Sequence, residues 1–136
     1  MLINFSEKHA NELYAPILAE DEISYPIYCM YRGTGFFDSN SMDGGYITCT
    51  NKGRIITAKD TFGKWSFVVG DIRTVKDIKI KKTFFKQYII EMALPTEKKD
   101  YKIKFQVAPK VYGCDLPNQG RNMEKMLEIL QNGRVE

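Results

Sequence analysis

The chain has 136 residues, of which 43% are hydrophobic and 27% are charged, the balance of an ordinary globular protein with one domain. That length allows a substantial hydrophobic core, and the composition argues against bulk disorder. The net charge of +3 is too small to indicate a nucleic-acid partner, and no apolar run approaches the ~18–20 residues that a membrane-spanning helix requires.

The first predicted element is a short helix over residues 5–18. Ser6 can cap its start, and Pro16 is expected to end or distort its last turn. Its apolar side chains share one face at helical spacing, namely Ala10, Leu13, Tyr14 and Ile17.

A strand and a long connection are predicted next. Residues 22–31 alternate apolar with other side chains and are rich in β-branched and aromatic types, while Pro26 indicates an edge position or a bulge. The connection over residues 32–45, "RGTGFFDSNSMDGG", is full of Gly, Ser, Asn and Asp, and we interpret it as a mobile loop.

A well-specified hairpin follows in the stretch "TCTNKGRIITAKD". Strands are predicted over residues 46–50 and 54–58, and Gly53 is best suited to the positive φ angle of the turn between them. Register in such a hairpin decides which side chains form the core. Another strand is predicted over residues 65–69.

The rest of the chain is predicted to form three strands and a helix. The strands cover residues 72–82, 85–94 and 101–107, and the last of these has the clearest alternation in the sequence. The helix covers residues 118–132, with an apolar stripe at i, i+3, i+4 and i+7 made of Met123, Met126, Leu127 and Leu130.

These elements predict a mainly-β fold. Because each strand has one apolar face, the sheet must fold over on itself or take a cover. We therefore expect a seven-stranded, strongly bent antiparallel sheet, or partly open barrel, over residues 20–132, capped by the helix 118–132. With the short N-terminal helix, residues 1–136 form a single domain.

Two stretches resemble the bacterial pleckstrin-homology-like and GRAM-like domains, a family of unknown function. They are "GYITCTNKGRIITAKD" (Gly45–Asp60) and "WSFVVGDIRTVKDIKI" (Trp65–Ile80). The residues that match the family pattern are Thr50, Asn51, Lys52, Arg54, Ile55 and Ile56 in the first stretch, with Gly53 as an insertion, and Val69, Asp71, Ile72 and Val75 in the second. The resemblance covers roughly residues 20–132 and implies the pleckstrin-homology superfold.

The best-known property of that superfold is inositol-phosphate binding. Its lipid-binding members carry basic residues at the end of the first strand, in the first loop and on the second strand. Here those positions offer Arg32 alone, and the loop also holds Asp38 and Asp43. A polyphosphate needs several converging donors, so this departure argues against a phosphoinositide site.

The lysines gather later in the chain. The candidate patch consists of Lys79, Lys81, Lys82, Lys86, Lys102 and Lys104. One interpretation is a surface for anionic lipid, nucleic acid or an acidic protein. The other is a solvated face whose lysines protect the sheet edges, and the interleaved Asp77 and Glu91 favour it.

The remaining candidate contacts are aromatic. Arg32 with Phe36 and Phe37 forms a candidate contact in the first loop, and Phe84-Phe85 is a second adjacent pair beside a turn. In a strand one ring of each pair would be exposed for a membrane or protein partner; alternatively both rings pack beneath their own loop, which we favour.

Signals for an enzyme are missing from the sequence. His9 is the single histidine, no hydrolase or zinc-protease motif occurs, and "DSNSMDGG" fails as a calcium loop because Met42 occupies a ligand position. We therefore expect no catalytic residue, no metal and no cofactor.

The location follows from the cysteines and the N-terminus. Cys29, Cys49 and Cys114 are odd in number and widely spaced, as in reduced cytoplasmic proteins. Glu7 and Glu12 stand where a secretory signal would be apolar, so we expect none in this chain.

The expected function is a non-enzymatic binding or assembly module in the cytoplasm. A protein partner or self-association is the first hypothesis, since edge strands make both accessible. An anionic membrane surface bound through the lysines of residues 79–104 is the second, and a small ligand inside an aromatic-rich barrel is the third.

Overall fold

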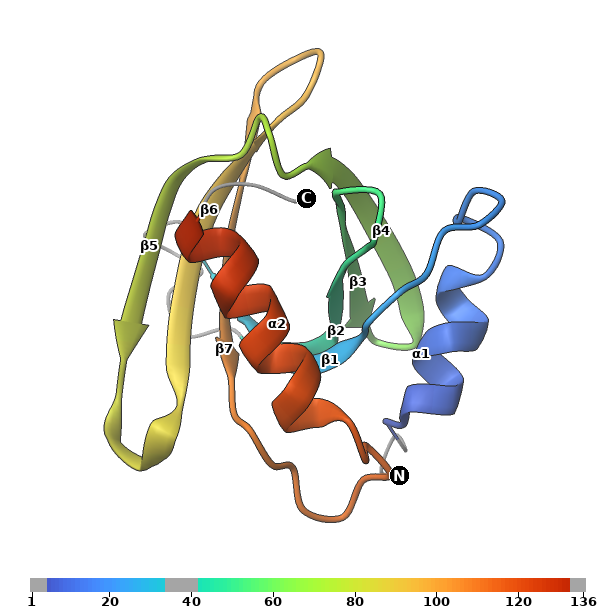
Figure 1. Ribbon diagram of the computed structural model, residues 1–136, viewed down its shortest axis with the longest axis vertical. Coiled ribbons are helices and arrows are strands. Elements are labelled where there is room, and N and C mark those ends of the chain that lie inside the picture. Colours follow the sequence, from blue (N-terminus) through green and yellow to red (C-terminus); the bar gives the residue numbers. More distant parts are fainter. Residues whose placement is uncertain (1–4, 34–41, 133–136) are drawn as a thin grey trace.

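In the computed structural model, residues 5–33 and 42–132 are described, and they form one open antiparallel sheet with two helices (Figure 1). The elements are α1 (Glu7–Tyr14), β1 (Ile27–Arg32), β2 (Met42–Cys49), β3 (Arg54–Thr61), β4 (Lys64–Asp71), β5 (Lys76–Lys82), a one-turn 3₁₀ helix (Phe84–Lys86), β6 (Tyr88–Pro95), β7 (Asp100–Val107) and α2 (Gln119–Asn132). The strand order is β4-β3-β2-β1-β7-β6-β5. The predicted seven-stranded, mainly-β architecture is confirmed.

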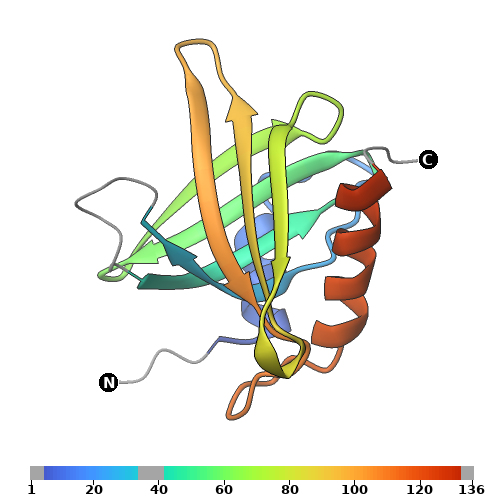
Figure 2. The same ribbon diagram turned by 90° about the vertical axis from the view of Figure 1, so that its left-hand side faces the viewer.

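The sheet bends where β1 meets β7, and the two halves face each other across the main core. β1 and β7 pair only from Met30↔Gln106 to Arg32↔Lys104, so the halves diverge on either side of this short seam. Side chains from both halves and from α2 fill the interior, among them Ile47, Phe105 and Leu130. Figure 2 shows α2 along one end of the bent sheet. These filled positions count against a ligand chamber in the main core.

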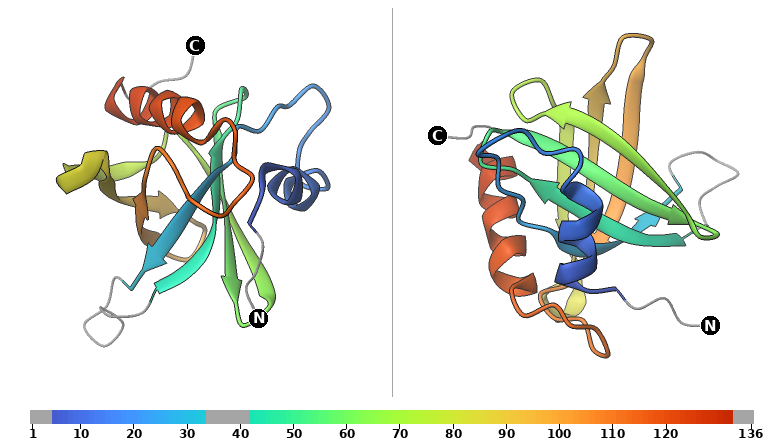
Figure 3. Two further views of the ribbon diagram at one scale, coloured as in Figure 1. Left: turned by 90° about the horizontal axis from the view of Figure 1, so that it is seen from below. Right: turned by 90° about the vertical axis from the view of Figure 1, so that its right-hand side faces the viewer.

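The helix α1 covers the outer face of the first half of the sheet (Figure 3, right). Ala10 and Tyr14 are completely buried against Ile56 and Ala58 of β3, and the Tyr14 hydroxyl donates to the Ile56 carbonyl at 3.0 Å. Since Ile55 points into the main core, β3 is buried on both faces. Burying one large apolar side chain stabilises a fold by about 1.5–3 kcal/mol, so this cover matters.

The β2–β3 hairpin also fixes the segment that leads from α1 to β1. Glu22 is buried, accepts from the Thr50 hydroxyl at 2.6 Å and from Arg54 Nε at 2.9 Å, and is ion-paired with Arg54. Arg54 Nη2 also donates to the Ile17 carbonyl, and Asn51 Oδ1 accepts from the Ile23 amide. The hydrogen bond from Arg54 is the main reason that the pKa of Glu22 falls to about 2.

Several predicted boundaries in the first half were wrong. The helix ends at Tyr14, and β1 begins only at Ile27, because residues 22–26 are held by side chains of the hairpin and form no strand, as in the bond from the Tyr25 amide to Thr48 Oγ1. Residues 42–45, expected in a loop, belong to β2. Two glycines make this possible, since a Cβ on Gly45 would lie 2.1 Å from the carbonyl oxygen of Ala58.

The predicted β5 and β6 were too long at their N-terminal ends. Residues 72–75 form a turn, with Thr74 and Val75 amides donating to the Asp71 carbonyl, and β5 starts at Lys76. The chain between β5 and β6 makes a tight turn in which Phe85 and Lys86 have positive φ angles. The periodicity of the sequence did not reveal these two turns, because apolar side chains continue through them.

Candidate functional site

The strand register places four of the six candidate lysines on one outer face of the second half. Lys79 lies opposite Glu91, Glu91 opposite Lys104, and Lys104 opposite Arg32, so these side chains form a row across β5, β6, β7 and β1. Lys81 and Lys102 stand two residues from Lys79 and Lys104 and so share that face. Arg32 therefore joins the lysines, which spacing along the sequence did not indicate.

The other two candidate lysines are set apart. Lys82 lies two residues beyond Ile80, on the side of β5 that faces the core, although its position at the strand end leaves it exposed. Lys86 belongs to the turn between β5 and β6. Phe36 and Phe37 lie outside the described residues, as does the side chain of Phe84. Phe85 is 89% exposed, contrary to the interpretation that both rings of its pair are packed.

A cavity of about 490 Å³ lies where β1 ends and the β3–β4 hairpin turns. In the ribbon these segments lie at the end of the sheet away from α2 (Figure 2). Its lining comes from both halves of the sheet. The basic residues along its lining are Arg32 from β1, Lys59 from β3, and Lys102 and Lys104 from β7. The register turns Lys59 toward the inner face, and it turns the other three toward the outer face. Thr57, Thr61 and Ser66 add hydroxyl groups.

Positive charge dominates this cavity. Asp43 is the acidic residue in its lining, and its Oδ2 lies 3.5 Å from Lys59 Nζ, with both side chains about one-third exposed. That contact offsets the charge of Lys59, so the net positive charge of the lining comes from Arg32, Lys102 and Lys104, which alternate with its inward-facing residues. Such a lining attracts an anion.

Arg32 carries the clearest sign of an unfilled interaction. Its Nε is buried and makes no hydrogen bond to any of the residues that the structure describes. Leaving a buried donor unpaired costs about 1–3 kcal/mol, more for a charged group. An acceptor bound beside this nitrogen would remove that cost.

Phe62 stands at the rim of the same cavity. The β3–β4 hairpin turns through Phe62 and Gly63, both with positive φ, and Asp60 Oδ1 accepts from the Gly63 amide at 2.8 Å. Such turns favour Asn-Gly, because a bulky residue is strained at positive φ. Yet the Phe62 side chain is fully exposed. Nothing in the sequence singled out Phe62.

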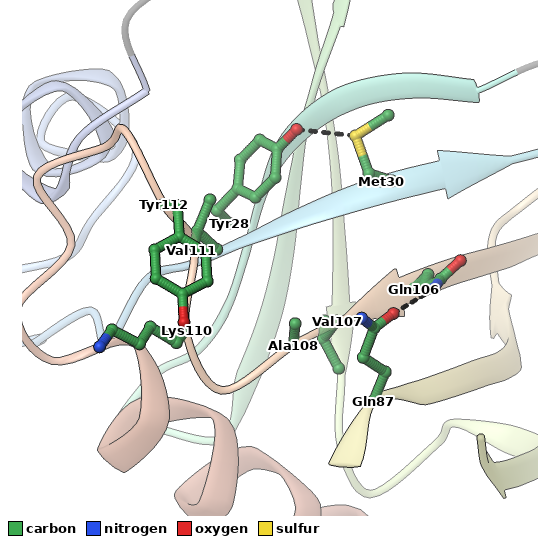
Figure 4. A pocket seen from close by; sticks show the side chains of 9 residues that line it. All are labelled: Tyr28, Met30, Gln87, Gln106, Val107, Ala108, Lys110, Val111 and Tyr112. Atoms are coloured by element: carbon green, nitrogen blue, oxygen red, sulfur yellow. Dashed lines mark hydrogen bonds between the residues drawn. The ribbon is translucent and has the colours of Figure 1, made fainter. Parts of the chain in front are cut away.

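A second hollow, of about 290 Å³, lies on the outer face of β1 and β7 beside residues 108–112 (Figure 4). Tyr28, Met30 and Tyr112 contribute to a mainly apolar lining. The Tyr28 hydroxyl donates to Met30 Sδ at 2.7 Å, and Lys110 Nζ lies 5.2 Å from the centre of the Tyr112 ring. This hollow could take a small apolar group and has little to fix its orientation.

The single histidine packs among aromatic side chains and lies outside the cavity. His9 Nδ1 is 3.1 Å from the Tyr46 hydroxyl, and its ring packs edge-on to Trp65, on the face that α1 covers and not in the cavity. Among the described residues no group of His, Cys, Asp and Glu could hold a metal ion.

The two core cysteines are not reactive groups. Cys29 and Cys49 are buried and free, and burial raises the pKa of both, that of Cys49 to about 12. Thiols in this state stay protonated and unreactive. No helix among the described residues combines the length and the hydropathy that crossing a bilayer would take.

No family model matches the sequence, and no curated protein matches it in sequence either. A solved structure with a similar fold is the hSac2 domain from the human phosphoinositide phosphatase Sac2. The two chains are 12% identical, with a TM-score of 0.56 over 93% of this chain and 79% of that chain. At this identity the likeness extends to the fold alone.

Proposed function

We propose that the protein is a non-enzymatic binding module with a pleckstrin-homology-like fold. Its 490 Å³ cavity, beside Arg32 and the β3–β4 hairpin, receives an anionic group carried by a membrane surface. The buried, unpaired Nε of Arg32 is the observation that carries the proposal. A guanidinium accompanied by lysines suits phosphate, since charged hydrogen bonds to phosphate oxygens are among the strongest that side chains make.

The donors of this site come from strands that are distant in sequence. The sequence argument against an inositol-phosphate site counted Arg32 alone on the first strands. Lys59 of β3 and Lys102 and Lys104 of β7 line the same cavity as Arg32, and they support the proposal as basic residues that the argument from the sequence did not count beside it. The strand pairing of β1 with β7 is what brings Lys104 beside Arg32.

Phe62 favours a membrane as the source of the anion. Its ring, fully exposed at the rim, sits in the sequence between Lys59 and Lys64 and projects from a hairpin tip. Basic residues near an anionic leaflet contribute about 1 kcal/mol each, and an aromatic ring is favourable at the level of the headgroups. The similar fold belongs to a domain of a phosphoinositide phosphatase, but a likeness in fold carries no argument about its ligand.

The cysteines are consistent with a cytoplasmic location. Cys29 and Cys49 are free thiols in the core, as expected in a reducing compartment. The anionic lipids of the cytoplasmic leaflet are then the surface that this module would meet.

Vesicle sedimentation tests the proposal. The full chain should pellet with phosphatidylcholine vesicles that contain phosphatidylserine or a phosphoinositide, and less so as salt rises. Lys102→Gln with Lys104→Gln should weaken binding by about 2 kcal/mol, roughly thirtyfold. Lys8→Gln with Lys52→Gln, which removes the same charge from exposed positions elsewhere, is the matched control and should retain binding.

A second arm separates a membrane from a free anion. Inositol hexakisphosphate is titrated into the protein, and into the vesicle assay as a competitor. Binding of the soluble phosphate without any binding to vesicles would keep the cavity as the anion site and remove the membrane from the proposal. Binding to neither probe at low salt would overturn the proposal.

A further inference from the structure

The two edge strands of the sheet differ in how they are protected. At β5 the register with β6 shifts between Lys76 and Lys79, Asp77 has a φ of 57°, and Lys79, Lys81 and Lys82 line the strand. A bulge and a row of lysines are common devices that prevent an edge from pairing with another chain.

The edge at β4 has no such device. It pairs with β3 in unbroken register from Arg54↔Asp71 to Thr61↔Lys64, and its other side is the end of the sheet (Figure 3, right). Its middle residues, "WSFVVG", are uncharged. On the outer face Phe67 and Val69 remain 37% and 44% exposed beside α1. An unbroken, uncharged edge with exposed apolar side chains invites another strand.

We propose that β4 pairs antiparallel with β4 of a second copy of this chain, so that the two sheets join across a two-fold axis. The order of apolar side chains along the strand favours a second copy. Phe67 and Val69 flank Val68 and share the outer face, so antiparallel self-pairing can set Phe67 of each copy beside Val69 of the other. Every favourable contact then occurs twice.

The faces of the sheet restrict the register. Residues that lie opposite each other must share a face, so the axis passes through a residue and not between two. The register centred on Val68 sets Phe67 of each copy against Val69 of the other. Aromatic and β-branched side chains make favourable cross-strand pairs, and this one buries the apolar surface that α1 leaves open.

This inference is independent of the anion site, although the two adjoin. Phe67 and Val69 are on the outer face, whereas Ser66 and Val68 of the same strand line the cavity. Vesicle binding by a monomeric variant therefore separates failure of one proposal from failure of the other.

Sedimentation velocity of the full chain over a wide range of concentrations is the first test. The mass should rise from 15.7 kDa toward twice that value. Val69→Lys should weaken dimerisation by about tenfold or more, because it sets a charge against Phe67 at both symmetric positions. Ile23→Lys replaces another exposed apolar side chain away from β4 and should leave the dimer intact.

A strict monomer at the highest concentration would overturn the proposal, as would a dimer that Val69→Lys leaves unchanged. A cross-linking experiment covers the case in which that variant folds poorly. In a Cys114→Ser background, Val68→Cys should form a disulfide-linked dimer on mild oxidation, since the axis places the two cysteines opposite each other. Ser66→Cys, on the same face, should remain unlinked; equal linking of both variants, or of neither, would contradict this register.

Discussion

In the first half of the sheet the inner strands β2 and β3 are covered on both faces, whereas the second half, β5 to β7, is covered on one. In β3, Ile55 faces the main core and Ile56 lies under α1, and both are fully buried. In β7, Ile103 and Phe105 are buried while Lys102 and Lys104 alternate with them and are less so. β2 and β3 are therefore built as an interior layer, and the second half presents a charged face to solvent.

That difference explains where polar residues are needed. A strand buried on both faces must have its cover fixed, and the Glu22–Arg54 pair does this from the turn between β2 and β3. A strand with one solvated face needs no such cover, and alternating apolar and polar side chains are enough to place it in the sheet. The four predictions below test this contrast, beginning with the core that the two halves share.

Leu127→Asp should have the largest effect, because Leu127 of α2 packs in the core between the halves. A carboxylate there loses its hydration without gaining a partner, and we expect a loss of about 4 kcal/mol or more in the free energy of unfolding. Urea denaturation followed by far-UV circular dichroism measures it. Glu128→Ala, on the exposed side of the same helix, is the control; a Leu127→Asp variant that unfolds like the parent would show that α2 does not close the core.

Arg54→Met should destabilise the protein by about 3 kcal/mol, since Glu22 would remain buried without its partner. The effect should be uneven. Hydrogen exchange should accelerate in α1 and in residues 17–25 first, because Arg54 ties both Glu22 and the Ile17 carbonyl to the hairpin. Equal acceleration of exchange in β6 and β7 would show that Arg54 stabilises both halves alike.

The sequence predicted β7 more closely than the strands of the first half, for the same physical reason. Alternation revealed β7 because one of its faces is solvated, while the continuous "RIITA" of β3 gave no hint that α1 would cover it. Gly44 and Gly45 looked like loop residues, but they let β2 approach Phe5 and the Ala58 carbonyl.

The candidate site was harder still to predict. Arg32 was singled out from its place at the end of the first strand, and Lys102 and Lys104 from their clustering. That they surround one cavity with Lys59 depends on the pairing of β1 with β7 and on the bend of the sheet. Contacts so distant along the chain leave no periodic signal, and the exposure of Phe62 at its rim leaves none either.

Lowering the pH should have the third-largest effect, a loss of stability where Glu22 holds the first half together. The pKa of Glu22 is about 2 in the folded protein, against a usual value near 4.5, because Arg54 stabilises the carboxylate. This stabilisation is complete above pH 4.5 and is lost as the pH falls toward 2. Between pH 5 and pH 2.5 we expect the pair to lose about 2 kcal/mol. The comparison is with Glu22→Gln, which should lack this part of the pH dependence while keeping that of Asp71, whose pKa Arg73 also lowers.

Phe62→Asn should have the smallest effect on stability, and its sign should be positive. Asn-Gly suits a turn with two positive φ angles, so the variant should gain about 0.5–1 kcal/mol and melt a few degrees higher. Phe85→Asn is a matched control, since Phe85 also has a positive φ and an exposed ring, in the turn between β5 and β6. If Phe62 contacts lipid, its replacement alone should reduce binding to anionic vesicles while both variants become more stable. Higher stability together with weaker vesicle binding would show that Phe62 serves membrane contact at the expense of stability. If both variants bind vesicles as the parent does, Phe62 has no part in the site.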